Sequence, residues 1–173
     1  MTAKTVDAPI DMAAVARVAR RVGLQNIVLI GAHAERFPSK QRGLLEPVVD
    51  HDHRLAGKGP KALEIESTFK FVVKQAGTDI LKATFVYRLF YSLQGDEPVD
   101  GSDAKVFALA NGPYHAWPFV RELLFGMTSK MGLPPFILPV LTFQPPRPAA
   151  ETPVRSGRPV AEARRRARVA HKR

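Results

Sequence analysis

The sequence predicts an α+β fold: a four-stranded antiparallel sheet with a long crossover connection, one long helix packed on one face of the sheet, and a short N-terminal helix. Residues 62–74 and 79–93 alternate apolar and polar side chains, which is typical of strands with one buried face. Residues 117–131 carry apolar side chains at helical spacing. Strands and helices do not alternate regularly along the chain, so a parallel α/β fold is excluded.

Size and composition predict one domain of about 140 residues followed by a tail. The chain has 173 residues, 45% of them apolar, which is enough for a hydrophobic core. It contains no cysteine, which excludes disulfides, thiol chemistry and cysteine-based zinc sites. The N-terminus lacks a signal-like apolar run and no stretch of about 18 apolar residues is present, so we expect a cytoplasmic protein.

The N-terminal part begins with residues 1–9, which we expect to be disordered. Asp11 is a candidate N-cap for a helix that extends to Val22, with Gly23 as its stop. Residues 24–38 are rich in β-branched side chains and predict the first strand, which Pro38 ends.

A long connection is expected from residue 39 to residue 61, too long for an ordinary hairpin loop and therefore a candidate functional segment. Its triplet His51-Asp52-His53 invites a metal-site interpretation. Adjacent residues rarely converge on one ion, however, and no third ligand is near in the sequence. The preferred interpretation is a solvated loop.

The two alternating stretches predict paired central strands. Gln75 to Asp79 has the composition of a hairpin turn. Residues 104–112 are interpreted as a short fourth strand that leads to the long helix. The side chains expected on the buried face are Leu63, Ile65, Phe69, Phe71 and Val73 of the first strand, and Leu81, Ala83, Phe85, Tyr87, Leu89, Tyr91 and Leu93 of the second.

The helix predicted over 117–131 starts with Pro118 in its first turn and ends before Gly132, a candidate left-handed C-cap. It is apolar on more than one face, so one face can cover the sheet while another contacts a second subunit or a ligand. The residues expected at an oligomer interface are Val120, Leu123, Leu124, Met127 and Met131. Three prolines then keep residues 133–143 from forming further helix.

This C-terminal pattern resembles the SecB export chaperone family. The matching features are the aromatic-Pro-aromatic opening at Trp117, the Arg121-Glu122 pair, a basic residue before Gly132, and the proline-broken apolar segment that ends at Phe143. The start and end of the stretch 24–37 are also similar to the first strand of that family. The resemblance covers roughly residues 24–143.

The resemblance implies an ATP-independent chaperone that holds unfolded polypeptide in an apolar groove, either for protein export or for the antitoxin of a toxin–antitoxin module. It further implies a homotetramer, a crossover loop that covers one end of the groove, and docking to the motor protein SecA. No cofactor and no enzymatic activity are expected. The residues expected to bind polypeptide are Leu44, Leu45, Val48 and Val49 of the connection, Trp117 of the helix, and Phe136, Ile137, Leu138, Leu141 and Phe143 of the segment after it.

The chain departs from the family after Phe143, where a second helix and an acidic end would be expected. Residues 144–173 are first Pro-rich and then Arg-rich, which predicts a flexible tail. Eight Arg/Lys and one Glu give residues 155–173 a charge of +7, out of a net +10 for the chain. This basic end argues against SecA docking through acidic surfaces and leaves open weak, salt-sensitive nucleic-acid binding.

Enzymatic function has little support in the sequence. No nucleophile elbow, phosphate-binding loop or zinc-protease motif occurs. His115 could serve as a general base, but it lacks a spaced carboxylate or nucleophile partner, and a structural role is the preferred interpretation. A small-ligand pocket between sheet and helix remains a further alternative.

Overall fold

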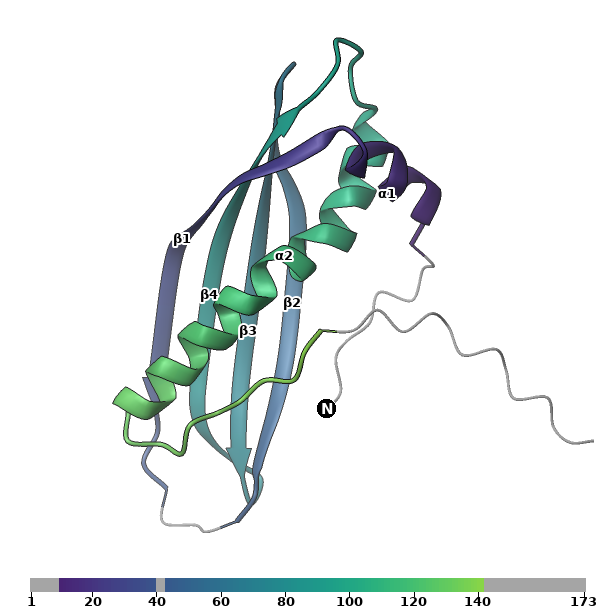
Figure 1. Ribbon diagram of the computed structural model, residues 1–173. Coiled ribbons are helices and arrows are strands. Elements are labelled where there is room, and N and C mark those ends of the chain that lie inside the picture. Colours follow the sequence, from purple (N-terminus) through teal and green to yellow (C-terminus); the bar gives the residue numbers. More distant parts are fainter. Residues whose placement is uncertain (1–9, 40–42, 142–173) are drawn as a thin grey trace, which may run out of the picture. The chain divides into compact units, whose positions relative to one another are not determined.

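The computed structural model describes residues 10–39 and 43–141 of the chain (Figure 1). Its elements are α1 (Met12–Ala19), β1 (Val22–Arg36), β2 (Leu45–Lys58), β3 (Ala62–Gln75), β4 (Thr78–Leu93) and α2 (Gly101–Lys130). The predicted fold class is confirmed: a four-stranded antiparallel sheet, one long helix and a short N-terminal helix. The expected disordered N-terminus (1–9) and the flexible tail (144–173) lie outside the described residues.

The four strands lie in the order β1-β4-β3-β2, each antiparallel to its neighbours. The expected hairpin joins β3 to β4 through Ala76 (φ 48°) and Gly77 (φ 80°), two consecutive left-handed residues that match the twist of the strands. All twelve side chains expected on the buried face are buried, which confirms the predicted buried faces of both central strands.

The interpretation of residues 39–61 as a connection is wrong, because Leu45–Lys58 forms strand β2. Val49, His51 and His53 pair with Phe71, Phe69 and Ser67 of β3, and this inward-facing row alternates with polar residues on the other face. A crossover exists, since β1 and β2 occupy opposite edges of the sheet, but it runs only from Arg36 to Leu45. Pro47 is tolerated because an edge strand leaves one row of backbone groups unpaired.

Residues 104–112 are helical, so the predicted fourth strand there is wrong and α2 starts far earlier than Pro118. Asp100 caps the helix by accepting hydrogen bonds from the amides of Ser102 (2.7 Å) and Asp103 (3.2 Å). Pro113 and Pro118 lie inside α2. Their loss of backbone hydrogen bonds is offset by burial of the first half of the helix, through Ala104, Phe107, Ala108 and Ala110.

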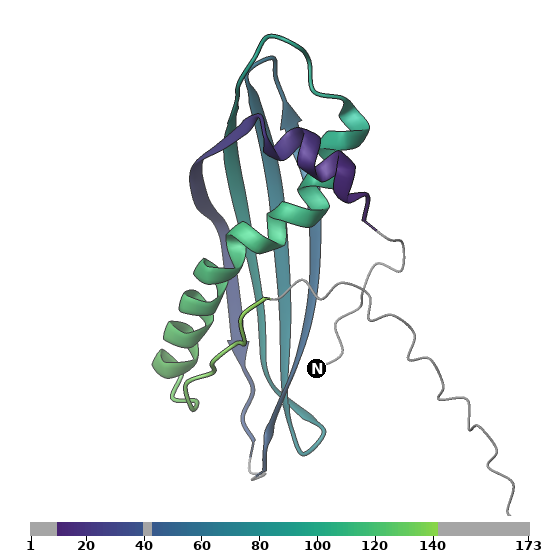
Figure 2. The same ribbon diagram turned by 45° about the vertical axis from the view of Figure 1, so that its right-hand side comes forward.

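Helix α1 packs against the first turns of α2 (Figure 2). The predicted cap is confirmed: the Asp11 carboxylate accepts from the amides of Ala13 (2.9 Å) and Ala14 (3.2 Å). The helix ends at Ala19 rather than at Val22, because Val22 already pairs with Leu93 in the sheet. Arg17 forms a two-pronged ion pair with Asp103 of α2, at 2.7 and 2.8 Å. Within the described residues neither helix is long and apolar enough to cross a membrane.

Candidate functional site

Residues 132–141, called the strap below, leave α2 through a Schellman motif. Gly132 has φ +67° and its amide donates to the carbonyl of Ser129 (3.1 Å), while the amide of Leu133 donates to the carbonyl of Thr128 (3.0 Å). The predicted C-cap role of Gly132 is therefore confirmed. The turn reverses the chain, and Figure 1 shows the strap running back alongside α2.

The strap forms no helix or strand, and hydrogen bonds from side chains of α2 fix its position instead. The indole N–H of Trp117 donates to the carbonyl of Pro139 (2.8 Å), and Nε of Arg121 donates to the carbonyl of Leu138 (2.9 Å). Trp117 and Arg121 are four residues apart and so lie on the same side of the helix, which lets them reach consecutive carbonyls. The side chain of Leu138 is fully buried, so it fixes the strap to the core.

Helix α2 packs against β2, β3 and, to a lesser degree, β4, which leaves the inward face of β1 partly uncovered. Leu24, Leu29 and the half-buried Ile27 point to this face, because they are paired with buried residues of β4. Exposed aromatic side chains on the outer side of α2 adjoin it: Phe119 and Phe125 are 44% and 45% exposed. A broad apolar surface thus extends from β1 across α2 to the strap.

Three open hollows mark this surface. The first hollow, of about 410 Å³, lies between β1 and the second half of α2. The second, of about 330 Å³, lies between β1, the middle of α2 and the end of the strap. The third, of about 380 Å³, lies between α2 and the middle of the strap. The hollows share residues: Phe119 lines the first and second, Pro118 and Arg121 the second and third, and Glu122 the first and third. We call Pro118, Phe119, Arg121, Glu122 and Phe125 the outer α2 surface.

Part of the predicted polypeptide-binding set lies at these hollows. Ile137 and Leu138 line the third hollow, and Trp117 and Leu141 line the second. Ile137 is 72% exposed, whereas Trp117 and Leu138 are buried and act mainly in packing. Phe136 is half-buried and packs on the core, and Phe143 lies outside the described residues.

The predicted residues from the connection do not line any of the three hollows. Leu45, Val48 and Val49 belong to β2, at the opposite edge of the sheet from β1. Val49 is buried in the core and Leu45 packs against it, while Leu44 and Val48 are exposed. The sequence interpretation placed them near the strap only because it assumed a loop where the chain forms a strand.

The predicted oligomer-interface residues divide into fully buried and half-buried ones. Val120 and Leu124 are fully buried against the chain's own sheet, so their side chains are not available to a second subunit. Leu123, Met127 and Met131 are half-buried and pack at the edge of the core, with Leu123 and Met127 also lining the first hollow. Phe119 and Phe125, which the sequence analysis did not select, take the exposed positions. If the start of the helix had been known, the helical spacing would have placed Val120 and Leu124 on the side facing the sheet. Phe119 and Phe125 would then have been expected on the exposed side.

His51 and His53 lie in β2 and face the core, so the interpretation of this triplet as a solvated loop is wrong. Nε2 of His53 lies 2.9 Å from Nδ1 of His51, and burial lowers the pKa of His53 to about 3. Asp52 is exposed on the other face of the strand. No group of three potential metal ligands gathers anywhere in the part of the chain that is described.

His115 has a hydrogen-bond partner: its Nδ1 lies 2.8 Å from the hydroxyl of Tyr91. Burial lowers the pKa of His115 and raises that of Tyr91, so both side chains are neutral at physiological pH. The pair anchors the middle of α2 to β4. This geometry agrees with the structural role expected for His115.

The outer face of the sheet carries opposite charges in pairs rather than one sign of charge. Arg88 contacts Glu66 (2.7 Å) and Glu64 (3.2 Å), and Arg54 also contacts Glu66. Hydrogen bonds from Arg54, followed by those from Arg88, lower the pKa of Glu66. This face is therefore a balanced network of ion pairs.

Comparisons with known proteins identify a relative over most of the chain and another over a shorter stretch. No protein-family model matches. The chain is 28% identical to the SecB-like chaperone Rv1957 of Mycobacterium tuberculosis, over 92% of this chain and 100% of the relative. It is also 38% identical to the protein-export protein SecB of Anaplasma phagocytophilum, over 53 residues that cover 31% of this chain and 34% of that protein.

A solved structure shares the fold. The structure of Rv1957 in complex with a ChAD peptide from the antitoxin HigA1 superposes with a TM-score of 0.69 and 18% identity, over 76% of this chain and 97% of that one. The sequence likeness over nearly the full length and the common fold agree with each other. The chain is therefore similar over nearly its whole length to a SecB-like chaperone, and it shares the fold of that protein.

Proposed function

We propose that the chain is an ATP-independent chaperone of the cytoplasm that holds unfolded polypeptide on the apolar surface between β1, α2 and the strap. The observation that carries this proposal is the continuity of the three hollows around the outer α2 surface. Exposed apolar area of this kind is uncommon on proteins that have no partner. Aromatic and aliphatic walls with few polar groups favour binding of many apolar segments over one specific ligand.

An antitoxin polypeptide is the client that we propose. A relative that aligns over its entire length with this chain has been seen with an antitoxin peptide bound, whereas the likeness to an export SecB covers a third of the chain. The balanced ion pairs on the outer face of the sheet also differ from the acidic surface that SecA docking would require. Export precursors would bind the same apolar surface, so client choice is a separate question from client holding.

The test is suppression of aggregation of an unfolded antitoxin in the absence of nucleotide. Phe119→Ser and Ile137→Ser remove exposed apolar side chains that line the hollows. Each should weaken client binding by on the order of 1.5–3 kcal/mol if the side chain is an anchor, without changing the melting temperature. Leu109→Ser is the matched control, because Leu109 is also exposed on α2 (39%) but lines none of the three hollows. Equal protection by all three variants would refute the proposed surface.

A further inference from the structure

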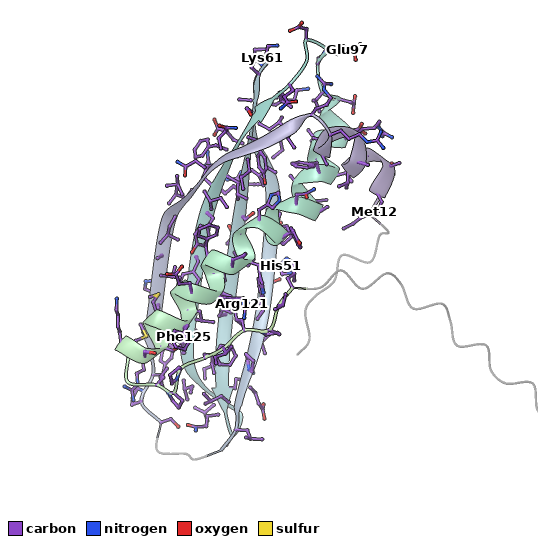
Figure 3. The ribbon with its side chains drawn as sticks, viewed as in Figure 1. Met12, His51, Lys61, Glu97, Arg121 and Phe125 are labelled. Carbon is purple, nitrogen blue, oxygen red and sulfur yellow. The ribbon has the colours of Figure 1, made fainter. Side chains whose placement is uncertain are left out.

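Arg121 is placed at the boundary between two of the apolar hollows. It lines the second hollow, with Trp117 and Val140, and the third hollow, with Phe125 and Ile137. Figure 3 shows Arg121 and Phe125 on the side of α2 along which the strap runs. A polypeptide that filled both hollows would therefore have to pass over this guanidinium group.

The strap fixes the direction of the Arg121 side chain. Nε donates to the carbonyl of Leu138 at 2.9 Å, and the side chain is half-buried. This hydrogen bond leaves Nη1 and Nη2, the two end nitrogens of the guanidinium, which together present parallel N–H groups suited to both oxygens of a carboxylate. Among the described residues, no carboxylate forms an ion pair with Arg121.

The charges near Arg121 do not neutralise it. Glu122 is the next residue in the chain and lines the third hollow, but neighbouring residues of a helix point in directions about 100° apart. No carboxylate is among the residues that line the second hollow. The second hollow is therefore an apolar site with one positive charge at its rim.

We propose that Arg121 selects client segments in which an acidic side chain lies between apolar ones. The apolar side chains enter the second and third hollows, and the carboxylate between them accepts hydrogen bonds from Nη1 and Nη2 of Arg121. This inference rests on the proposed function and gives it a sequence preference: a client with Asp or Glu at the central position binds better than the same client with a neutral or basic residue there.

The experiment compares three labelled peptides that differ only at one central position, flanked on both sides by Leu and Phe. The central residue is Asp, Asn or Lys, and binding to the full chain is measured by fluorescence anisotropy. The Asp peptide should bind roughly five- to tenfold more tightly than the Asn peptide, and the Lys peptide more weakly than either. High salt should reduce the difference between Asp and Asn, because the pair is only half-buried.

Variants of the chain assign the preference to Arg121. Arg121→Gln should bind the Asp and Asn peptides with affinities within about twofold of each other, since a neutral amide replaces the charged group. Lys105→Gln is the matched control: it removes one positive charge from an exposed position of α2 that lines none of the three hollows, and the preference for Asp should persist. Arg121→Lys, which keeps the charge without the two parallel donors, should retain a reduced preference.

The outcomes separate this inference from the proposed function. If the Asn peptide binds and the Asp peptide binds no better, client holding stands and the role of Arg121 is wrong. If Lys105→Gln reduces the preference as much as Arg121→Gln does, the effect is one of net charge and the role of Arg121 is again wrong. If no peptide binds the folded chain, the proposed function fails and this inference with it. Circular dichroism and the melting temperature show whether each variant is folded. If Arg121→Gln is unfolded, the preference of Arg121→Lys between the Asp and Asn peptides tests the role of Arg121.

Discussion

Two glycines inside α2, Gly112 and Gly126, have opposite surroundings. A Cβ atom added at Gly112 would lie 2.8 Å from Oγ of Ser67, 3.2 Å from Cγ2 of Ile65 and 3.3 Å from Nδ1 of His53, whereas one added at Gly126 would meet no atom within 4 Å. At Gly112 the helix therefore lies close against β2 and β3. Helix propensity alone would favour alanine at both positions.

We therefore expect Gly112→Ala to lower the free energy of unfolding by about 1–3 kcal/mol through overpacking. Gly126→Ala should raise it by about 0.5–1 kcal/mol, because alanine is the better helix former and nothing obstructs it. Urea unfolding of the two variants gives both values. A gain in stability in Gly112→Ala as large as that in Gly126→Ala would mean that the helix does not contact the sheet at Ser67.

His53 gives the folded chain a pH dependence. Its pKa is lowered to about 3, first by burial and then by the charge of His51, while a histidine in the unfolded chain has a pKa near 6.5. Between these values the unfolded state binds a proton that the folded state does not. Stability is therefore complete above about pH 6.5 and falls as the pH drops toward 3, by about 2 kcal/mol between pH 6.5 and 5.

His53→Gln should flatten this part of the stability profile, since glutamine does not titrate. The residual slope from His51, whose pKa is also lowered by burial, should be smaller. Urea unfolding at several pH values between 7 and 5 measures the two slopes. An unchanged slope in His53→Gln would contradict the buried, neutral state of this histidine.

At the scale of the element, the strap depends on one side chain. Leu138 is fully buried, while its neighbour Ile137 is 72% exposed. Leu138→Ala should destabilise the chain by about 2–5 kcal/mol, because it leaves a cavity between strap and core. Ile137→Ala should change the free energy of unfolding by less than about 0.5 kcal/mol. Thermal and urea unfolding distinguish these expectations, and equal effects would show that the strap is not anchored through Leu138.

At the scale of the whole molecule, β1 is an edge strand, and among the described residues no strand pairs with its outer edge, which is therefore open to a second subunit. The outer edge of β1 spans Val22–Arg36 and carries exposed apolar side chains, with Val28 37% and Ile30 49% exposed. Such edges pair readily with another strand unless charge or proline interrupts them. Association through β1 would leave the outer α2 surface open to a client.

We expect a homotetramer, with a mass by light scattering near four times 19.1 kDa. Ile30→Lys places a charge on the β1 edge and should lower this mass while the fold is retained. Val140→Lys is the control, because Val140 is similarly exposed but lies on the strap. A stable monomer in the parent chain would rule out the tetramer, and an unchanged mass in Ile30→Lys would exclude the β1 edge.

The basic end of the chain is expected to act independently of client holding. Residues 155–173 hold a charge of +7, and their removal should leave folding and aggregation suppression unchanged. Any binding of single-stranded DNA should disappear with them and should fall steeply with salt in the full chain. Anisotropy of a labelled oligonucleotide tests this, and binding that survives the truncation would place the contact in the folded domain.

The sequence alone determined the two central strands, their buried faces and the turn between them. Alternation is a local property, and from Leu63 to Val73 and from Leu81 to Leu93 every second residue except Ser67 is apolar, so one face had to be buried whatever packed on it. The caps Asp11 and Gly132 were equally local, because each satisfies backbone groups within a few residues of itself. The motifs around Trp117 predicted a resemblance to SecB chaperones, and the comparisons found a SecB-like chaperone that is similar over 92% of the chain.

Only the tertiary structure decided the extent of α2, the existence of β2 and the residues of the candidate site. Pro118 locally predicts the first turn of a helix, but α2 begins at Gly101, and burial of its first half against the sheet offsets the backbone hydrogen bonds lost at Pro113 and Pro118. The polar residues of β2 are locally typical of a loop, but this segment pairs with β3 and forms an edge strand. Phe119 and Val120 are equally apolar, and the orientation of α2 on the sheet left one exposed and buried the other. Which apolar face remains open depends on contacts between distant segments, and these do not appear in any local pattern.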